Sequence, residues 1–150
     1  MSEPTSIDDP ELGTFVRATT ELTDGTVLTH DWYAGDVSVE GAELDLMLEG
    51  TSADEARALL PRVRETIASL DVLSRLATDA VVTAFSTGSP EEHELDDAVS
   101  DLVLDTIEAS SDHSVILHFT DSCGTHFPEG YWPAVHFGSD GQITQVTVES

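Results

Sequence analysis

The chain has 150 residues, 39% of them hydrophobic, and its thirty acidic residues against five Arg give a formal net charge of −25. That length and apolar content are typical of one folded domain with a buried core. The charge excludes binding to nucleic acids and to anionic membranes, because both need a basic protein surface.

Three further features concern the cellular location of the protein. No run of 18 apolar residues occurs, so we expect no membrane span. The acidic, polar N-terminus is unlike a secretory signal. A single Cys excludes an intramolecular disulfide framework and fits a reducing compartment. We therefore expect a cytoplasmic protein whose oligomeric state the sequence leaves open.

Residues 1–11 predict a flexible acidic tail, because Pro4 and Pro10 bracket acids and small polar residues with nothing to bury. The folded domain is then expected to span 12–150. Its first strand is predicted to begin at residue 12.

A hairpin pattern follows the first strand. Asp24-Gly25 predicts a turn, because Gly tolerates the positive φ that tight turns demand. Beyond it, apolar and polar residues alternate on both sides of Glu40-Gly41, which predicts an antiparallel hairpin with one buried face. The apolar members of that alternation are Val37, Val39, Leu44, Leu46 and Leu48.

The period becomes helical at Ser52, where Ser52-Ala53-Asp54-Glu55 forms a capping box. Two apolar stripes at helical spacing follow, and Leu70-Asp71 is predicted to separate them into two helices. One long helix is the alternative. Pro61 predicts a kink or a late start, because it lacks the N–H that a helix interior needs. We expect the helical region 52–86 to pack on the face formed by Leu44, Leu46 and Leu48.

A short third helix is predicted after Ser89-Pro90-Glu91-Glu92, with Ser as N-cap and Pro at the first helical position. It is expected to bury Leu95, Val99 and Leu102.

The last third predicts strands again. Val115, Leu117 and Phe119 alternate with Ile116, His118 and Thr120, and Asp140-Gly141 predicts a tight turn between two later strands. The order strands, helices, strands predicts an α+β domain. We expect a mainly antiparallel sheet, made of N-terminal hairpins and a C-terminal meander, with a helix pair and a short third helix grouped on one side.

The segment 118–136 holds side chains that ligate zinc or another transition metal. Cys123-x-x-His126 offers two donors, but no second close pair completes a motif. The strand register that would place the flanking histidines is not fixed by the sequence. We therefore expect no cofactor and no structural metal. The candidate metal ligands are His118, Asp121, Cys123, His126 and His136.

Catalytic interpretations of this segment are weaker. A Cys123/His126 nucleophile pair is disfavoured, because the neighbouring acids raise the pKa of a thiol. A small metal-dependent hydrolase is the main alternative to a binding function. Its ligands would be His118, Asp121, His126 and His136, with Glu129 as a base.

Aromatic residues supply the candidate binding positions, since Trp and Tyr are enriched at binding hot spots. Packing between the sheet and the helices is the alternative for most of them. Phe127-Pro128-Glu129-Gly130 differs, because it is a turn-rich loop tip that presents an aromatic ring. The candidate binding residues are Trp32, Tyr33, Phe127, Tyr131 and Trp132.

Spaced apolar positions and turns cover most of 12–148: Gly13-x-Phe15, Trp32-x-x-Gly35-x-Val37, Leu70-Asp71, Val115-x-Leu117-x-Phe119, Trp132-x-x-x-His136-Phe137 and Asp140-Gly141-x-Ile143. In these positions the chain resembles an uncharacterised bacterial family catalogued only as a domain of unknown function. The resemblance implies a small cytoplasmic α+β domain without assigned catalytic residues. Families of this kind often look like accessory or immunity proteins of bacterial toxin systems.

These observations favour a non-enzymatic domain that acts by binding another macromolecule. The charge makes a basic protein the favoured partner, because opposite charges steer association. The alternatives are the metal-dependent hydrolase and a housekeeping domain that is acidic through salt adaptation and has no dedicated partner.

Overall fold

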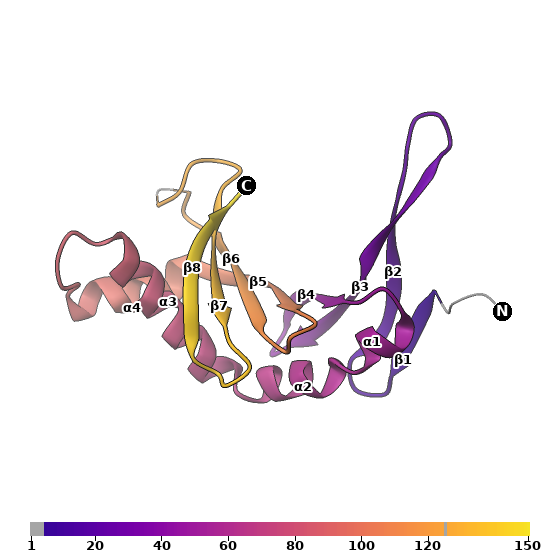
Figure 1. Cartoon of the computed structure of the whole chain (residues 1–150). Helices are drawn as coiled ribbons and strands as arrows, with labels where there is room; N and C mark the ends of the chain where they lie inside the picture. Colours follow the sequence, from indigo (N-terminus) through magenta and orange to yellow (C-terminus); the bar gives the residue numbers. More distant parts are fainter. Residues whose placement is uncertain (1–4, 125) are drawn as a thin grey trace.

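The computed structural model, whose described residues are 5–124 and 126–150, is built on one eight-stranded sheet (Figure 1). The strands lie in sequence order, and all neighbours are antiparallel except β4 and β5, which are parallel. An α+β fold with a mainly antiparallel sheet is therefore confirmed. The strands are β1 (Ser6–Asp9), β2 (Gly13–Glu21), β3 (Val27–Val39), β4 (Ala42–Glu49), β5 (Leu102–Ala109), β6 (Val115–Asp121), β7 (Trp132–Phe137) and β8 (Ile143–Glu149).

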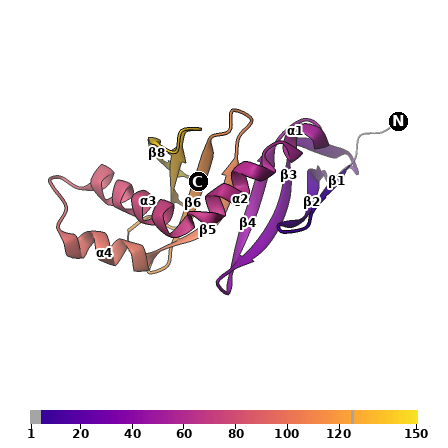
Figure 2. The ribbon, with the colours of Figure 1, turned by 90° about the horizontal axis from the view of Figure 1, so that it is seen from below.

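The four helices of the described residues all lie in the connection between β4 and β5. A parallel pair needs a long connection, because its strands cannot be joined by a tight turn. Figure 2 views the molecule from below and shows α2 crossing in front of the central strands, with α3 and α4 side by side at one end. The helices are α1 (Ala53–Arg57), α2 (Leu60–Ala68), α3 (Leu70–Phe85) and α4 (Glu92–Asp101).

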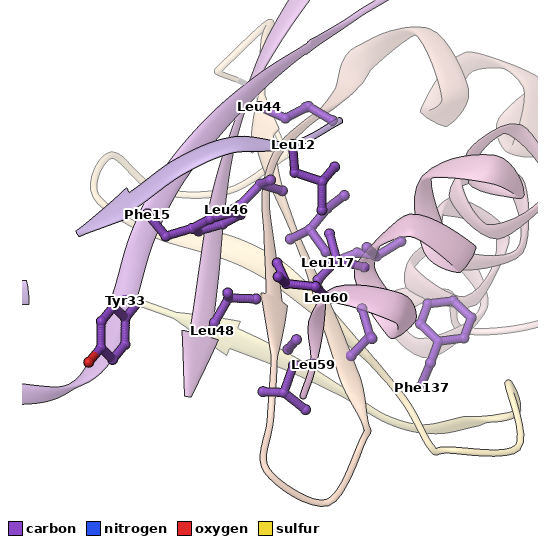
Figure 3. Close-up of a cluster of buried hydrophobic side chains, with 14 of the residues drawn as sticks. Leu12, Phe15, Tyr33, Leu44, Leu46, Leu48, Leu59, Leu60, Leu117 and Phe137 are labelled. Carbon is purple, nitrogen blue, oxygen red and sulfur yellow. The ribbon is translucent and has the colours of Figure 1, made fainter. Parts of the chain in front are cut away.

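The core lies between the sheet and the first helices. Leu46 and Leu48 of β4 are fully buried and belong to one cluster with Leu60 of α2, as Figure 3 shows. Apolar and polar side chains alternate along β3 and β4, and residues directly opposite each other in the two strands point to the same side of the sheet. The apolar side chains of both strands therefore share one buried face. Tyr33 pairs with Leu48 in this register.

The turns follow the sequence closely. Glu40 and Gly41 both have positive φ and link β3 to β4 in a two-residue hairpin. Gly35 has a different role, because a Cβ atom there would lie 2.7 Å from Cδ2 of Phe15. A glycine at this position lets β3 run unbroken past the buried Phe15 ring.

The helix boundaries also follow local signals. The Ser52 hydroxyl accepts the N–H of Glu55 at 3.2 Å, as a cap should, and α2 starts at Leu60 with Pro61 in its first turn. A separate helix begins at Leu70.

The third predicted helix differs from the expectation. It starts at Glu92 and buries Ala98, whereas Val99 is 43% exposed. Leu102 is buried, but as the first residue of β5. The chain turns into the sheet at this point, so Leu102 packs from a strand rather than from the helix.

The predicted flexible tail is wrong over part of its length. Ser6–Asp9 forms an edge strand on β2, and Ile7 is only 1% exposed. One apolar side chain among acids was too weak a signal to reveal it. The remainder of the prediction, for residues 1–4, lies outside the described residues.

Asp9 anchors this strand. One carboxylate oxygen accepts the N–H groups of Glu11 and Leu12 at 2.9 Å each, and the other contacts the guanidinium of Arg64 on α2. Burial raises the pKa of the Asp9 carboxyl, but the N–H groups of Leu12 and Glu11 and the Arg64 charge outweigh it and hold that pKa below its usual value. The N-terminal strand is therefore tied to the helical layer.

Candidate functional site

The connection between β6 and β7 is a long loop organised by Asp121. One oxygen of its carboxylate accepts the N–H groups of His126 at 2.8 Å and Phe127 at 3.0 Å. Burial raises the pKa of the Asp121 carboxyl, but the N–H groups of Phe127 and His126 and the Cys123 thiol hold that pKa below its usual value. The ionised carboxylate thus closes the loop. Thr125 lies outside the described residues.

The loop is attached to the end of α4. The backbone N–H of Ser122 donates to the carbonyl of Asp101 at 2.8 Å, and the Ser122 hydroxyl donates to the same oxygen at 2.7 Å. This double contact brings the side chain of Asp101 to the loop.

A cluster of three different donor groups results, which we call the Cys–His–Asp cluster. Nε2 of His126 lies 3.1 Å from Oδ2 of Asp101, and the ligand atoms of Asp101, Cys123 and His126 all lie within 4.8 Å of one another. It is the one group of this kind found within 5–124 and 126–150. Two of its members were predicted from the sequence. Asp101 was missed, because it belongs to another element and one acid among thirty carries no signal.

The two remaining histidine candidates lie elsewhere. Nδ1 of His118 accepts the indole N–H of Trp132 at 3.0 Å, and its Nε2 lies 2.9 Å from Oε1 of Glu108. Both ring nitrogens are engaged, so His118 cannot ligate a metal without losing one contact. Nε2 of His136 lies 3.0 Å from the Thr147 hydroxyl.

The ligand set of the predicted hydrolase is accordingly spread out. Within the described residues, His118 and His136 do not belong to the group that contains His126. Asp121 uses its carboxylate to close the loop, and Glu129 is exposed at the loop tip.

The aromatic candidates have different environments. Tyr33 is fully buried, with the Arg17 guanidinium 5.5 Å from its ring centroid, so its surface cannot reach a partner. Its alternation with Val37 and Val39 was a sequence signal for burial. Trp32 is half-buried and stacks on His30. Trp132, also half-buried, contacts His118.

Phe127 and Tyr131, in contrast, line a groove of about 770 Å³ between the end of α3, α4, the loop and β8. We call it the α3–α4 groove. Phe127 meets Phe85 edge to face, with ring centroids 5.7 Å apart. The residues that line the groove are Val81, Val82, Phe85, Ser86, Glu94, Asp97, Ala98, Asp101, Leu102, His126, Phe127, Pro128, Tyr131 and Val148.

The groove combines exposed apolar surface with negative charge. Phe85 is 55% exposed, Tyr131 49% and Val148 42%, although all three are large apolar or aromatic side chains. Glu94, Asp97 and Asp101 lie along α4 at its side, and no Arg or Lys is among the described residues that line it. Such a surface suits a ligand that is both apolar and cationic.

Comparisons with known proteins gave no match for this chain. No protein-family model matches the chain, and neither the curated proteins nor the solved structures give a significant match. Within the described residues, none of the helices has the length and apolar character needed to cross a bilayer.

Proposed function

We propose that this domain binds a partner protein through the α3–α4 groove, and that the bound segment presents large apolar side chains beside Arg or Lys. The observation that supports this most directly is the exposure of Phe85 and Tyr131 inside a concave surface. Apolar surface of this kind is stabilised when a partner removes it from water.

The charge of the groove determines the class of partner. Glu94 and Asp97, both on α4, line the groove together with its apolar residues. Arg75, the closest cation in the sequence to these acids, is already paired with Asp79 and Asp96 at 3.0 Å each. The acids on the groove therefore favour a cationic ligand, and an acidic one would be repelled.

A binding role of this type agrees with the accessory or immunity-like function that the family resemblance implies. Such proteins act by covering a surface of another protein, which needs complementary shape and charge but no catalytic residues. The acidic surface as a whole would attract a basic partner from a distance, and the groove would supply the specific contact.

The proposal is tested with a defined probe, a fluorescent synthetic peptide in which Leu and Arg alternate. Fluorescence anisotropy in the presence of EDTA should show saturable binding to the wild-type domain. The Phe85→Ala variant should bind at least about fivefold more weakly, the change that corresponds to about 1 kcal/mol at a hot spot.

Matched controls separate the groove from general attraction by charge. Val72→Ala shortens another exposed apolar residue of α3, outside the groove, and should change the affinity by less than about twofold. Asp97→Asn should weaken binding, and a peptide with Gln in place of Arg should bind poorly. Equal effects of Phe85→Ala and Val72→Ala would overturn the proposal, because binding would then not depend on the groove.

A further inference from the structure

We propose that Asp101, Cys123 and His126 bind a zinc-like divalent cation at the end of the α3–α4 groove. A thiolate, an imidazole and a carboxylate are all ligands of Zn²⁺ in proteins. The sequence predicted no cofactor because it offered only the pair Cys123 and His126 close together. The third donor, Asp101, comes from α4.

The spacing of the donor atoms suits a tetrahedral ion. Two ligands bonded to zinc at about 2.0–2.3 Å lie roughly 3.4 Å apart when the geometry is tetrahedral. Nε2 of His126 and Oδ2 of Asp101 are 3.1 Å apart, and the Cys123 sulfur lies within 4.8 Å of both. Binding would bring the Cys123 sulfur closer to the other two donors and would replace the Asp101–His126 contact.

The surrounding structure holds these donors in place without the ion. Asp121 fixes the loop through the N–H groups of His126 and Phe127, and Ser122 fixes the loop to the Asp101 carbonyl. Asp121 also accepts from the Cys123 thiol at 3.3 Å, so it is placed to orient the sulfur. Groups in this position commonly tune a metal site without ligating the metal.

The site is open to solvent. Cys123 is exposed, and the side chain of His126 is 48% exposed. Three protein ligands leave the fourth position of a tetrahedral ion for water or for a ligand from outside, unlike the four-ligand sites that hold small domains together. Because Asp101 and His126 also line the groove, an ion bound to them would lie beside it.

The test uses Co²⁺ as a spectroscopic probe and Zn²⁺ for affinity, with excess Mg²⁺ present to occupy isolated carboxylates and with a non-chelating reductant. The wild-type domain should bind one Zn²⁺ per chain by calorimetry. Its Co²⁺ complex should show the charge-transfer absorption of a thiolate ligand. Cys123→Ser should lose that absorption, and Asp101→Asn and His126→Ala should each weaken Zn²⁺ binding by at least tenfold.

Two variants serve as matched controls. Asp97→Asn removes the same charge from the same helix, and His93→Ala removes another exposed imidazole; both should keep wild-type Zn²⁺ affinity within about threefold, because neither residue belongs to the cluster. Circular dichroism verifies that each variant is folded. Absence of the thiolate absorption, or equal Zn²⁺ affinity of the wild type and Cys123→Ser, would overturn the proposal.

This site and the proposed function can fail separately. The peptide assay is run in EDTA and depends on Phe85 and Asp97. The metal assay is run without peptide and depends on Cys123, which does not line the groove. A domain that binds the peptide but not the ion, or the reverse, identifies which of the two inferences is wrong.

Discussion

Each half of the sheet is a four-stranded meander, and each contains an Asp whose carboxylate accepts two backbone N–H groups. The two Asp residues have different roles. In β1–β4, Asp9 accepts two backbone N–H groups and meets the Arg64 guanidinium. In β5–β8, Asp121 also accepts two backbone N–H groups, but its other oxygen meets the Cys123 thiol. The first carboxylate secures a strand, whereas the second shapes the loop that contains Cys123 and His126.

The connections between strands also differ between the two halves. The β3–β4 hairpin of the N-terminal half closes in two residues, and its buried side chains form one cluster with residues of α1 and α2. The C-terminal half includes the loop after β6, which stands beside the ends of α3 and α4 and leaves a groove. Both halves contribute fully buried side chains, such as Leu46 in the first and Leu117 in the second, whereas the described residues that line the groove include none from β1–β4. The following predictions compare the buried core with the groove.

The largest effect is expected in the buried core. Leu46→Ala should lower the free energy of unfolding by about 2–5 kcal/mol, because the side chain is fully buried and the truncation leaves a cavity. Urea denaturation followed by circular dichroism measures the change. A loss below about 0.5 kcal/mol would mean that this face contributes little to the core.

The next effect concerns the strand anchor. Asp9→Asn should destabilise the domain by about 1–3 kcal/mol at neutral pH, because it removes the charge that Arg64 and two N–H groups stabilise. Since the pKa of Asp9 is lowered in the folded state, its contribution is present above about pH 4, the pKa of an unfolded Asp, and is lost as the pH falls through the folded value.

The pH dependence provides the control for that variant. Melting curves between pH 6 and pH 3 should show a smaller loss of stability for Asp9→Asn than for the wild type, because one carboxylate no longer titrates. Parallel pH profiles for the two proteins would contradict the anchoring role of Asp9.

A smaller and more general effect comes from the net charge of −25. Raising sodium chloride from 0.1 M to 1 M shortens the screening length from about 10 Å to about 3 Å and should relieve repulsion among the acids. The melting temperature should rise by a few degrees, equivalent to about 1 kcal/mol for a chain of this length. A melting temperature that does not change with salt would show that repulsion among the acidic side chains does not destabilise the fold.

The smallest effect on stability is expected in the groove. Phe85→Ala should change the free energy of unfolding by less than about 1 kcal/mol, because the ring is 55% exposed. Denaturation curves of Phe85→Ala and Leu46→Ala, compared directly, measure the contrast between the groove and the buried core. A loss of several kcal/mol for Phe85→Ala would assign the ring to the core and remove it as a recognition residue.

Local signals in the sequence predicted much of the fold. Glu40-Gly41 and Asp140-Gly141 gave their hairpins because turn geometry depends on a few adjacent residues. Ser52 gave the start of α1 for the same reason. The strand at residues 6–9 was missed, since its stability depends on Arg64 and on pairing with β2, neither of which is local.

The candidate site was predictable only in part. Cys123 and His126 were recognised because they are close in sequence, but the contribution of Asp101 depends on how the loop meets α4. Tyr33 was offered as a binding residue although its parity placed it with the buried face. The groove itself could not be predicted, because it lies between elements whose packing no local pattern specifies.

The parallel pairing of β4 with β5 has a consequence for the speed of folding. Each meander can form from contacts between neighbouring segments, but the two halves join only when the whole helical connection between β4 and β5 closes into a loop. The entropy cost of closing so long a loop arises before the β4–β5 pairing contributes any stabilising free energy. We therefore expect the union of the halves to be the slow step, with the hairpins and helices of each half formed earlier.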